Sequence, residues 1–207
     1  MQMVSGSQKG LPEPLLRAIG QYRRQIFVEQ LGWPLTCHDG MEADQFDRPD
    51  TLYIAAHNEQ GAVQGCARLL PTTSPYLLAD VFPELLDGAI PPCSPAIWEL
   101  SRFAASSPSA QGALRQFSAS FTVQLLRTAI TCAREQGAEW LISVSPAGIE
   151  RLLRHGGVPA MRAGPVRQIN GHQLFACWIA CQHRATASAA AGIPFVASDA
   201  GMIAAES

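Results

Sequence analysis

The chain has 207 residues, of which 47% are hydrophobic and 15% charged, and its formal net charge at pH 7 is -2. This length suits one domain with a sizeable core, and a slightly acidic chain without an aromatic and basic surface pattern is not typical of nucleic-acid binding. No apolar run approaches the roughly 20 residues that cross a bilayer, and the first residues lack the apolar core of a signal peptide, so we expect a cytoplasmic protein with no membrane partner.

The first predicted element is an amphipathic helix from Pro12 to Gln30, in which apolar residues recur at spacings of three and four. Gly32 and Pro34 follow, and both residue types end helices. The segment 36–50 is polar and rich in turn formers. It reads as a long loop, and long loops inside compact domains are usually functional.

Two strands are predicted at 51–57 and 62–70, joined by a turn at 58–61. Short helical turns fit residues 76–86. The next strand, 98–103, carries a carboxylate and a guanidinium among apolar residues, and both are costly to bury without partners. Structural partners, a wet edge or a functional site would each explain them. Alternation predicts Glu99, Ser101 and Phe103 on one face and Trp98, Leu100 and Arg102 on the other.

The second half predicts a helix at 111–136 stopped by Gly137, a buried strand at 140–144, and a final strand at 172–181. Ser145 and Pro146 suit the start of a helix that runs to Gly156. The alternation of these elements predicts an α/β fold with a mixed sheet and helices on both faces. We expect one domain, 1–184, and a loosely held tail, 185–207.

The distribution of charge and the spacing of cysteines and histidines indicate which ligands and partners to expect. Residues 39–99 hold ten acidic and two basic residues, whereas residues 102–167 hold eight arginines and three glutamates. Such polarity suggests a cationic ligand for the first half and an anionic partner for the second, although scattered surface charge is the simpler explanation. The six cysteines and five histidines show no ligand spacing, which predicts mostly buried free thiols and no metal.

Several short motifs together resemble the acyl-homoserine lactone synthases of the LuxI type, over about residues 12–182. They are Arg23, Phe27 and Trp33, the acidic motif Gly40-Met-Glu-Ala-Asp44-Gln-Phe-Asp47, Arg68, Phe82, and the strand motif Glu99-Leu-Ser-Arg102-Phe103. The resemblance implies a GNAT-like α/β/α sandwich whose mixed, twisted sheet is splayed into a V-shaped cleft. It also implies transfer of an acyl chain from acyl carrier protein to S-adenosylmethionine, a substrate rather than a cofactor, with release of lactone and methylthioadenosine.

The resemblance assigns Arg23, Phe27, Trp33, Asp44, Asp47, Arg68 and Arg102 to the S-adenosylmethionine site. The residue types suit this ligand, because arginine binds carboxylates, aromatic faces attract a sulfonium, and carboxylates bind amino and hydroxyl groups. Ordinary structural roles remain open for each: core packing for the aromatic residues, turn formation for the aspartates and a structural ion pair for Arg68.

Glu99, Ser101 and Arg102 are the catalytic candidates. The amine of the substrate must lose a proton before it attacks the thioester. A weak base such as Glu99, acting through water, would suffice for an amine with a pKa of about 7.7–8.0. Backbone N–H groups near Ser101 to Phe103 are candidates for stabilising the oxyanion.

The acyl chain needs an apolar pocket, for which the candidates are Phe82, Phe103, Leu125, Ile142 and Leu153, all of which could equally be ordinary core. In the family a threonine on the strand after the long helix accompanies a 3-oxo chain. Our alignment places Ile142 there, with Ser143 adjacent, which favours an unsubstituted chain. The surrounding motifs are similar to those of octanoyl- and hexanoyl-forming members, and we favour octanoyl.

Acyl carrier proteins are acidic, so arginines of the second half are candidates for docking. Arg151 and Arg154 share one face of a predicted helix, and a merely solvated face is the alternative. Further candidates are Arg115, Arg127, Arg162 and Arg167.

Two other function classes are alternatives to this interpretation. A GNAT-type acyl-CoA N-acyltransferase would carry a phosphate-binding loop ahead of its long helix, but Ser109 and Leu114 stand at the defining positions around Gly112. A non-catalytic ligand sensor would have no need of this combination of arginines and carboxylates.

Overall fold

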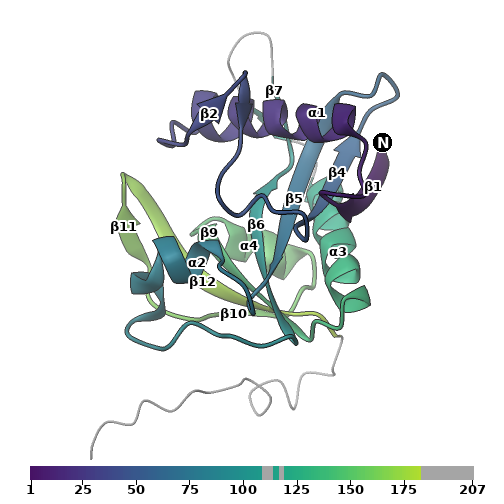
Figure 1. The fold of residues 1–207 in the computed structure, drawn as a ribbon. Helices are drawn as coiled ribbons and strands as arrows, with labels where there is room; N and C mark the ends of the chain where they lie inside the picture. The colour runs from purple at the N-terminus through teal and green to yellow at the C-terminus, as the bar shows by residue number, and fades with distance from the viewer. Residues whose placement is uncertain (109–113, 117–118, 183–207) are drawn as a thin grey trace, which may run out of the picture.

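The computed structural model describes residues 1–108, 114–116 and 119–182, so the predicted tail lies outside the described part. Its centre is an eight-stranded mixed sheet of order β1-β4-β5-β6-β9-β12-β10, with β11 paired to β12. Helices lie on both faces (Figure 1). The predicted α/β sandwich is therefore confirmed. Within the described residues, no helix is both long and apolar enough to cross a membrane.

The strands of the large sheet are β1 (Gln2–Ser7), β4 (Leu52–His57), β5 (Val63–Pro71), β6 (Ile97–Ala104), β9 (Trp140–Pro146), β10 (Ala160–Arg162), β11 (Arg167–Ile169) and β12 (His172–Ala180). Two small hairpins pair β2 (Cys37–His38) with β3 (Met41–Glu42), and β7 (Ser106–Pro108) with β8 (Leu114–Gln116). The helices are α1 (Glu13–Arg23), the π-helix η1 (Arg24–Gln30), α2 (Leu77–Val81), the 3-10 helix η2 (Pro83–Leu86), α3 (Ala119–Glu135) and α4 (Ile149–His155).

Most predicted elements are confirmed. The helix from Pro12 continues through α1 into η1, where the widened turn is closed by the N–H of Leu31, which donates to the carbonyl of Ile26 at 3.0 Å. The hairpin of β4 and β5 is antiparallel. Gly137, with a φ of +85°, lies just after α3, where a left-handed residue is favoured.

Three predicted boundaries were wrong. Residues 114–116 form β8 rather than helix, so α3 begins later than expected, at Ala119. Ser145 and Pro146 end strand β9, and α4 begins at Ile149 after Gly148. The sequence also failed to predict β1, β10 and β11. These short or polar strands are stabilised by antiparallel pairing with β4 or β12, which local sequence does not reveal.

Strands β6 and β9 are parallel neighbours for only part of their length. Their register runs from Ile97 opposite Trp140 to Leu100 opposite Ser143. Beyond this point β6 continues to Ala104 and β9 to Pro146, but the two strands no longer pair with each other. The strands therefore diverge into a wedge, which confirms the predicted V-shaped cleft.

A β-bulge in β6 corrects the predicted side-chain alternation. Arg68 of β5 is opposite Ser101, but Cys66 is opposite Ala104, so β6 has one extra residue between these pairs. Arg102 has a φ of +49°, a conformation that is uncommon outside glycine and marks many bulges at functional sites. The bulge carries Arg102 toward the partners of Arg68, while Phe103 packs against the core beneath α3.

Three apolar clusters hold the layers together. One lies between the sheet and helices α3 and α4 and includes Leu125, Leu141 and Leu153. A second, with Leu78 and Ile142, packs beneath α2 and η2 on the opposite face, and a third packs beneath α1. The cysteines are free. Cys66, Cys132, Cys177 and Cys181 are buried as predicted, whereas Cys37 and Cys93 are exposed.

Candidate active site

Three arginines with almost no exposed surface lie together near the wedge. Arg23 comes from the end of α1, Arg68 from β5 and Arg102 from the bulge of β6, and their exposed fractions are 2%, 0% and 6%. A guanidinium that leaves water requires both opposite charge and hydrogen bonds. The carboxylate partners of all three come from the acidic segment at residues 42–47.

Arg23 and Arg68 make forked contacts with the two predicted aspartates. Arg23 donates to Asp47 Oδ1 and Oδ2 at 2.7 and 3.0 Å. Arg68 donates to Asp44 Oδ1 and Oδ2 at 2.6 and 3.1 Å and to Asp47 Oδ1 at 3.0 Å. Its Nε also donates to Ser101 Oγ at 3.0 Å. Paired N–H donors fix both distance and orientation, so these side chains form a rigid unit.

Glu42 completes this unit, although the sequence reasoning did not select it. Its carboxylate accepts from Arg23 Nε at 2.5 Å and from Arg102 Nη2 at 2.9 Å, and only 1% of its surface is exposed. Arg102 Nη2 also donates to Asp44 Oδ2 at 2.8 Å. We call Arg23, Glu42, Asp44, Asp47, Arg68 and Arg102 the ionic network. Glu42 lies within the acidic motif, two residues before Asp44, and that position was the available signal.

The acidic segment is shaped by its own aspartates. Asp44 Oδ1 accepts from the N–H of Phe46 at 2.9 Å, and Asp47 Oδ2 accepts from the N–H of Asp44 at 2.8 Å. Such side-chain to backbone bonds stabilise turns. The turn-forming role that the sequence left open for these residues therefore coexists with their ion pairs.

The contacts of Asp47, Glu42 and Tyr53 determine the protonation states of these side chains. Burial alone would raise the pKa of Asp47, but the charges of Arg23 and Arg68 hold this pKa well below its usual range. For Glu42, likewise, the hydrogen bonds and charges of Arg102 and Arg23 outweigh burial and lower its pKa. Burial and the neighbouring Asp47 raise the pKa of Tyr53, so its hydroxyl stays protonated and donates to Asp47 Oδ1 at 2.5 Å. Glu42 and Asp47 are therefore ionised near neutral pH.

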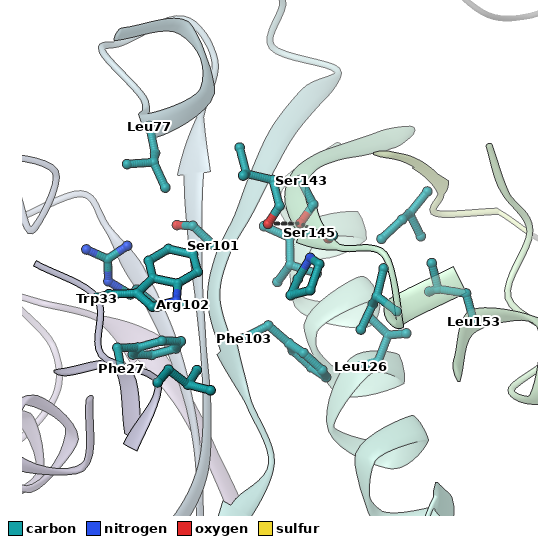
Figure 2. A pocket seen from close by; sticks show the side chains of 16 residues that line it. Phe27, Trp33, Leu77, Ser101, Arg102, Phe103, Leu126, Ser143, Ser145 and Leu153 are labelled. Carbon is teal, nitrogen blue, oxygen red and sulfur yellow. Dashed lines mark hydrogen bonds between the residues drawn. The ribbon is translucent and has the colours of Figure 1, made fainter. Parts of the chain in front are cut away.

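A cavity of about 110 Å³ occupies the wedge between β6 and β9, beside the ionic network. Figure 2 shows Arg102, Phe27 and Trp33 at one side of this inner cavity and Leu153 at the other. Its walls are Phe27, Leu31, Trp33, Leu77, Leu100, Ser101, Arg102, Phe103, Leu126, Ser143, Val144, Ser145, Pro146, Ile149, Leu153 and Ile179. Arg102 is the one member of the ionic network among these lining residues.

Aromatic rings frame the charged end of the inner cavity. The ring centroids of Phe27 and Trp33 are 6.2 Å apart, and the guanidinium of Arg102 lies 5.7 Å from the Phe27 centroid. Trp33 also contacts the ring of His172, at 5.6 Å, which ties the N-terminal segment to β12. Faces of this kind attract cations and stack on flat rings.

Glu99 lies outside the cavity wall. Its carboxylate is fully buried and accepts from the backbone N–H groups of Leu77 and Leu78, at 3.0 and 2.7 Å. Burial raises the pKa of Glu99 to about 7, despite the opposing effect of these two N–H groups. Leu77 lines the cavity, so the carboxylate lies directly behind one element of its wall.

The structure divides the five predicted acyl-pocket residues. Phe103 and Leu153 line the inner cavity. Leu125 packs in the same cluster without reaching the cavity wall. Ile142 and Phe82 belong to the cluster beneath α2, on the other face of the sheet.

The prediction that Ile142 lies beside the acyl chain, at the position where a threonine accompanies a 3-oxo chain, was wrong. Strand alternation turns the side chain of Ile142 away from the cavity. Ser143 and Ser145 point into the cavity instead, and their hydroxyl oxygens are 3.0 Å apart (Figure 2). Their polar character among apolar neighbours on β9 was the signal that could have singled them out.

A second, larger opening adjoins the inner cavity. This entrance cavity, of about 650 Å³, lies between η1, the start of α3 and α4, and it shares Phe27, Leu31, Phe103, Pro146 and Ile149 with the inner cavity. Arg151 lines it and Arg154 is also exposed on α4. Arg154 lines a different opening, behind α4, so the two side chains do not face the same cavity although both are exposed on one helix.

The other candidate arginines have varied surroundings. Arg162 pairs with Glu150 at 2.6 Å, Arg167 pairs with Asp87 at 2.6 Å, and Arg127 donates to the carbonyl of Gly156 at 2.9 Å. The side chain of Arg115 lies outside the described part. Among the residues that the structure describes, no group of three or more His, Cys, Asp or Glu is arranged to hold a metal ion.

Comparison with known proteins gives the context of this site. A family model described as autoinducer synthase matches residues 12–188. The acyl-homoserine-lactone synthase of Acinetobacter nosocomialis is 48% identical over 182 residues, covering 86% of this chain and 99% of the relative. That of Ralstonia nicotianae is 50% identical over 188 residues, covering 89% and 90%.

Solved structures agree. TofI, crystallised in a ternary complex with an inhibitor and MTA, is 43% identical, with a TM-score of 0.77 and coverage of 88% of this chain and 92% of TofI. BjaI, a CoA-dependent acyl-homoserine lactone synthase solved with SAM and isopentyl-CoA, is 26% identical, with a TM-score of 0.75 and coverage of 87% and 82%. An acyl-CoA N-acyltransferase from Pseudomonas aeruginosa, at 16% identity, shares the fold with a TM-score of 0.58 and coverage of 86% and 97%.

Three observations agree: the ionic network lies beside a cavity in an open sheet, the family model matches, and the sequence identity extends over nearly the whole length of the relatives. The chain belongs to the autoinducer synthase family and is an acyltransferase of the acyl-homoserine-lactone synthase type.

Proposed function

We propose that this enzyme transfers a medium-length acyl chain, preferably octanoyl, from acyl carrier protein to the amine of S-adenosylmethionine and then closes the lactone with release of methylthioadenosine. The observation that carries the proposal is the position of Arg102, which belongs to the ionic network and also lines the cavity. TofI, a relative of the same fold, holds MTA.

S-adenosylmethionine binds at the charged end of the inner cavity. Phe27 and Trp33 face its sulfonium and adenine, and Arg102 meets its carboxylate. Asp44, whose side chain keeps 17% of its surface exposed, is the network carboxylate available to the amine. Arg23, Asp47 and Arg68 are more deeply buried and hold these groups in place.

Acylation begins when the amine loses a proton and attacks the thioester carbon. Glu99, with a pKa of about 7, is matched to accept this proton near neutral pH through an intervening water. The tetrahedral oxyanion is stabilised by backbone N–H groups from Ser101 to Phe103. This role is supported by the loss of pairing between β6 and β9 after Leu100, on the edge that faces the cavity.

Lactone closure follows within one molecule. The carboxylate of the acylated substrate attacks the carbon beside the sulfonium, that carbon–sulfur bond breaks, and methylthioadenosine leaves with the electron pair. Because both reacting groups belong to the same molecule, correct positioning supplies most of the acceleration. Arg102 orients the carboxylate for this step.

The acyl donor enters through the entrance cavity, and its chain lies along Phe103 and Leu153. Arg151 and Arg154 are exposed on the same helix and suit an acidic carrier. Coenzyme A is the alternative donor, since BjaI of the same fold is CoA-dependent.

The test is to incubate the purified protein with S-adenosylmethionine and parallel series of acyl carriers and acyl-CoA thioesters, and to identify lactones and methylthioadenosine by mass. We expect octanoyl-homoserine lactone from the carrier, a rise in apparent KM with salt, and a further rise in the Arg151→Glu, Arg154→Glu double variant. Equal use of acyl-CoA, with no effect of salt or charge reversal, would contradict carrier docking. An N-acylated product without methylthioadenosine would instead indicate a simple N-acyltransferase.

A further inference from the structure

Behind helix α4 lies a third opening, of about 390 Å³, that the mechanism above does not use. We call it the outer hollow. Its walls include Leu153, Val158, Pro159, Met161 and Cys177, with Glu150 and Arg154 also lining it. Leu153 is the residue that the outer hollow shares with the inner cavity.

The sheet register shows how closely the two spaces approach each other. Ser143 of β9 lines the inner cavity, and its direct partner on β12, Cys177, lines the outer hollow. Ile179, two residues after Cys177 and on the same face, lines the inner cavity again. Leu153, Cys177 and Ile179 pack in one cluster, and Leu153 is only 2% exposed. The isobutyl group of Leu153 therefore lies over the pair of strands β9 and β12 and separates the inner cavity from the outer hollow.

We propose that Leu153 sets the length of acyl chain that the enzyme accepts, by closing the inner cavity against the outer hollow. The inference rests on the proposed function, because it assumes that the acyl chain runs away from Arg102. Figure 2 places Leu153 at the opposite side of the cavity from Arg102 and Trp33, where the methyl end of such a chain lies.

The sizes and chemistry of the two spaces support this role. The outer hollow, at about 390 Å³, is larger than the inner cavity, at about 110 Å³. The outer hollow would more than double the available space, and Leu153, Val158, Pro159, Met161 and Cys177 give it an apolar wall suited to methylene groups. Shortening Leu153 would join the two spaces.

The experiment compares wild type with Leu153→Ala and Leu153→Phe on carriers loaded with even-numbered chains from butanoyl to tetradecanoyl. Each extra buried methylene raises kcat/KM about fourfold. Decanoyl has two methylenes more than octanoyl, so Leu153→Ala should increase the ratio of decanoyl to octanoyl kcat/KM by about fifteenfold. Leu153→Phe should shift preference to shorter chains. An unchanged ratio in both variants would overturn the proposal.

Two further variants separate chain selection from general loss of packing. Leu69→Ala removes the same atoms from a fully buried position in the same cluster that lines neither space, so its length preference should match wild type. Adding Met161→Trp to Leu153→Ala refills the outer hollow and should restore the wild-type ratio. A similar shift in Leu69→Ala, or no restoration by Met161→Trp, would count against a specific partition.

A binding measurement keeps this test independent of turnover. Calorimetric titration of each variant with S-octyl- and S-dodecyl-pantetheine, which cannot transfer an acyl group, reports the same length preference. If wild type formed no lactone from any donor, the proposed function would fail, while the ratio of these two affinities would still decide the role of Leu153.

Discussion

The two walls of the wedge differ in how their side chains are held. On the β5 side, three arginines and three carboxylates bind one another, and five of these six side chains have 7% or less of their surface exposed. On the β9 and α4 side, the wall consists of apolar groups such as Ile149 and Leu153 and of the paired hydroxyls of Ser143 and Ser145.

This difference separates two tasks. A buried charge tolerates almost no loss of its partners, so the ionic network can hold one arrangement of a charged substrate. Apolar walls accept changes of volume at modest cost, so they can select among chains of different length. Substitutions on the first wall should therefore affect stability and catalysis together, whereas those on the second should affect selectivity.

The largest effect is expected from Glu42→Ala, which leaves Arg23 and Arg102 without a shared partner. Removing one member of a buried ionic pair typically costs about 3–5 kcal/mol, and we expect a loss of this size in the free energy of unfolding, measured with urea. Activity should fall by a larger factor than in any substitution on the apolar wall, because Arg102 loses its orientation.

A matched control is Glu29→Ala, which breaks the half-exposed pair of Glu29 with Arg24. Exposed pairs contribute only about 0–1 kcal/mol, so this variant should remain close to wild type in stability. Equal losses in Glu29→Ala and Glu42→Ala would show that burial of the ionic network is not what makes it sensitive.

Arg102→Lys keeps the charge but removes the fork that contacts both Glu42 and Asp44. Loss of two charge-assisted hydrogen bonds corresponds to about 3 kcal/mol, so we expect kcat/KM to fall by about 10²-fold. Steady-state kinetics with varied S-adenosylmethionine would measure this change. Wild-type kinetics in the variant would mean that only the charge of Arg102 matters.

Glu99→Gln tests the buried carboxylate that lies behind Leu77 in the cavity wall. If Glu99 is the base, activity in wild type rises as this carboxyl ionises at a pKa of about 7. In the variant the midpoint should move toward about 8, where an α-amino group titrates on its own, and activity at pH 7 should fall about tenfold.

The alternative for Glu99 is a purely structural role in holding the N–H groups of Leu77 and Leu78. In that case the variant would lose the same factor at every pH from 6 to 9, with an unchanged midpoint. A variant with the wild-type rate throughout this range would exclude both roles.

The smallest effect is expected from Ser143→Ala on the second wall. The hydroxyl of Ser145 loses its hydrogen-bond partner at 3.0 Å. This loss should lower the free energy of unfolding, measured by thermal unfolding, by about 1 kcal/mol. Turnover of unsubstituted octanoyl carrier should stay within about threefold of wild type, as measured by lactone formation. A loss comparable to that of Arg102→Lys would show that this wall also takes part in the chemistry.

The sequence by itself determined much of the charged wall. Asp44, Asp47, Arg68 and Arg102 were identifiable because charged residues in a turn-rich loop and in apolar strands stand out against their surroundings, and they occur at motif positions. The structure brings all four together. The hairpin of β4 and β5 was equally readable from its turn and its apolar strands.

Tertiary structure decided the rest. Alternation placed Arg102 on the wrong face because a bulge depends on the register with β5, not on local sequence. The apolar wall was only partly predictable, since leucine and isoleucine have the same chemistry in a packed core and beside a cavity. Leu153 reaches the cavity while Leu125 and Ile142 do not, because helix docking and the divergence of β6 from β9 determine where space remains.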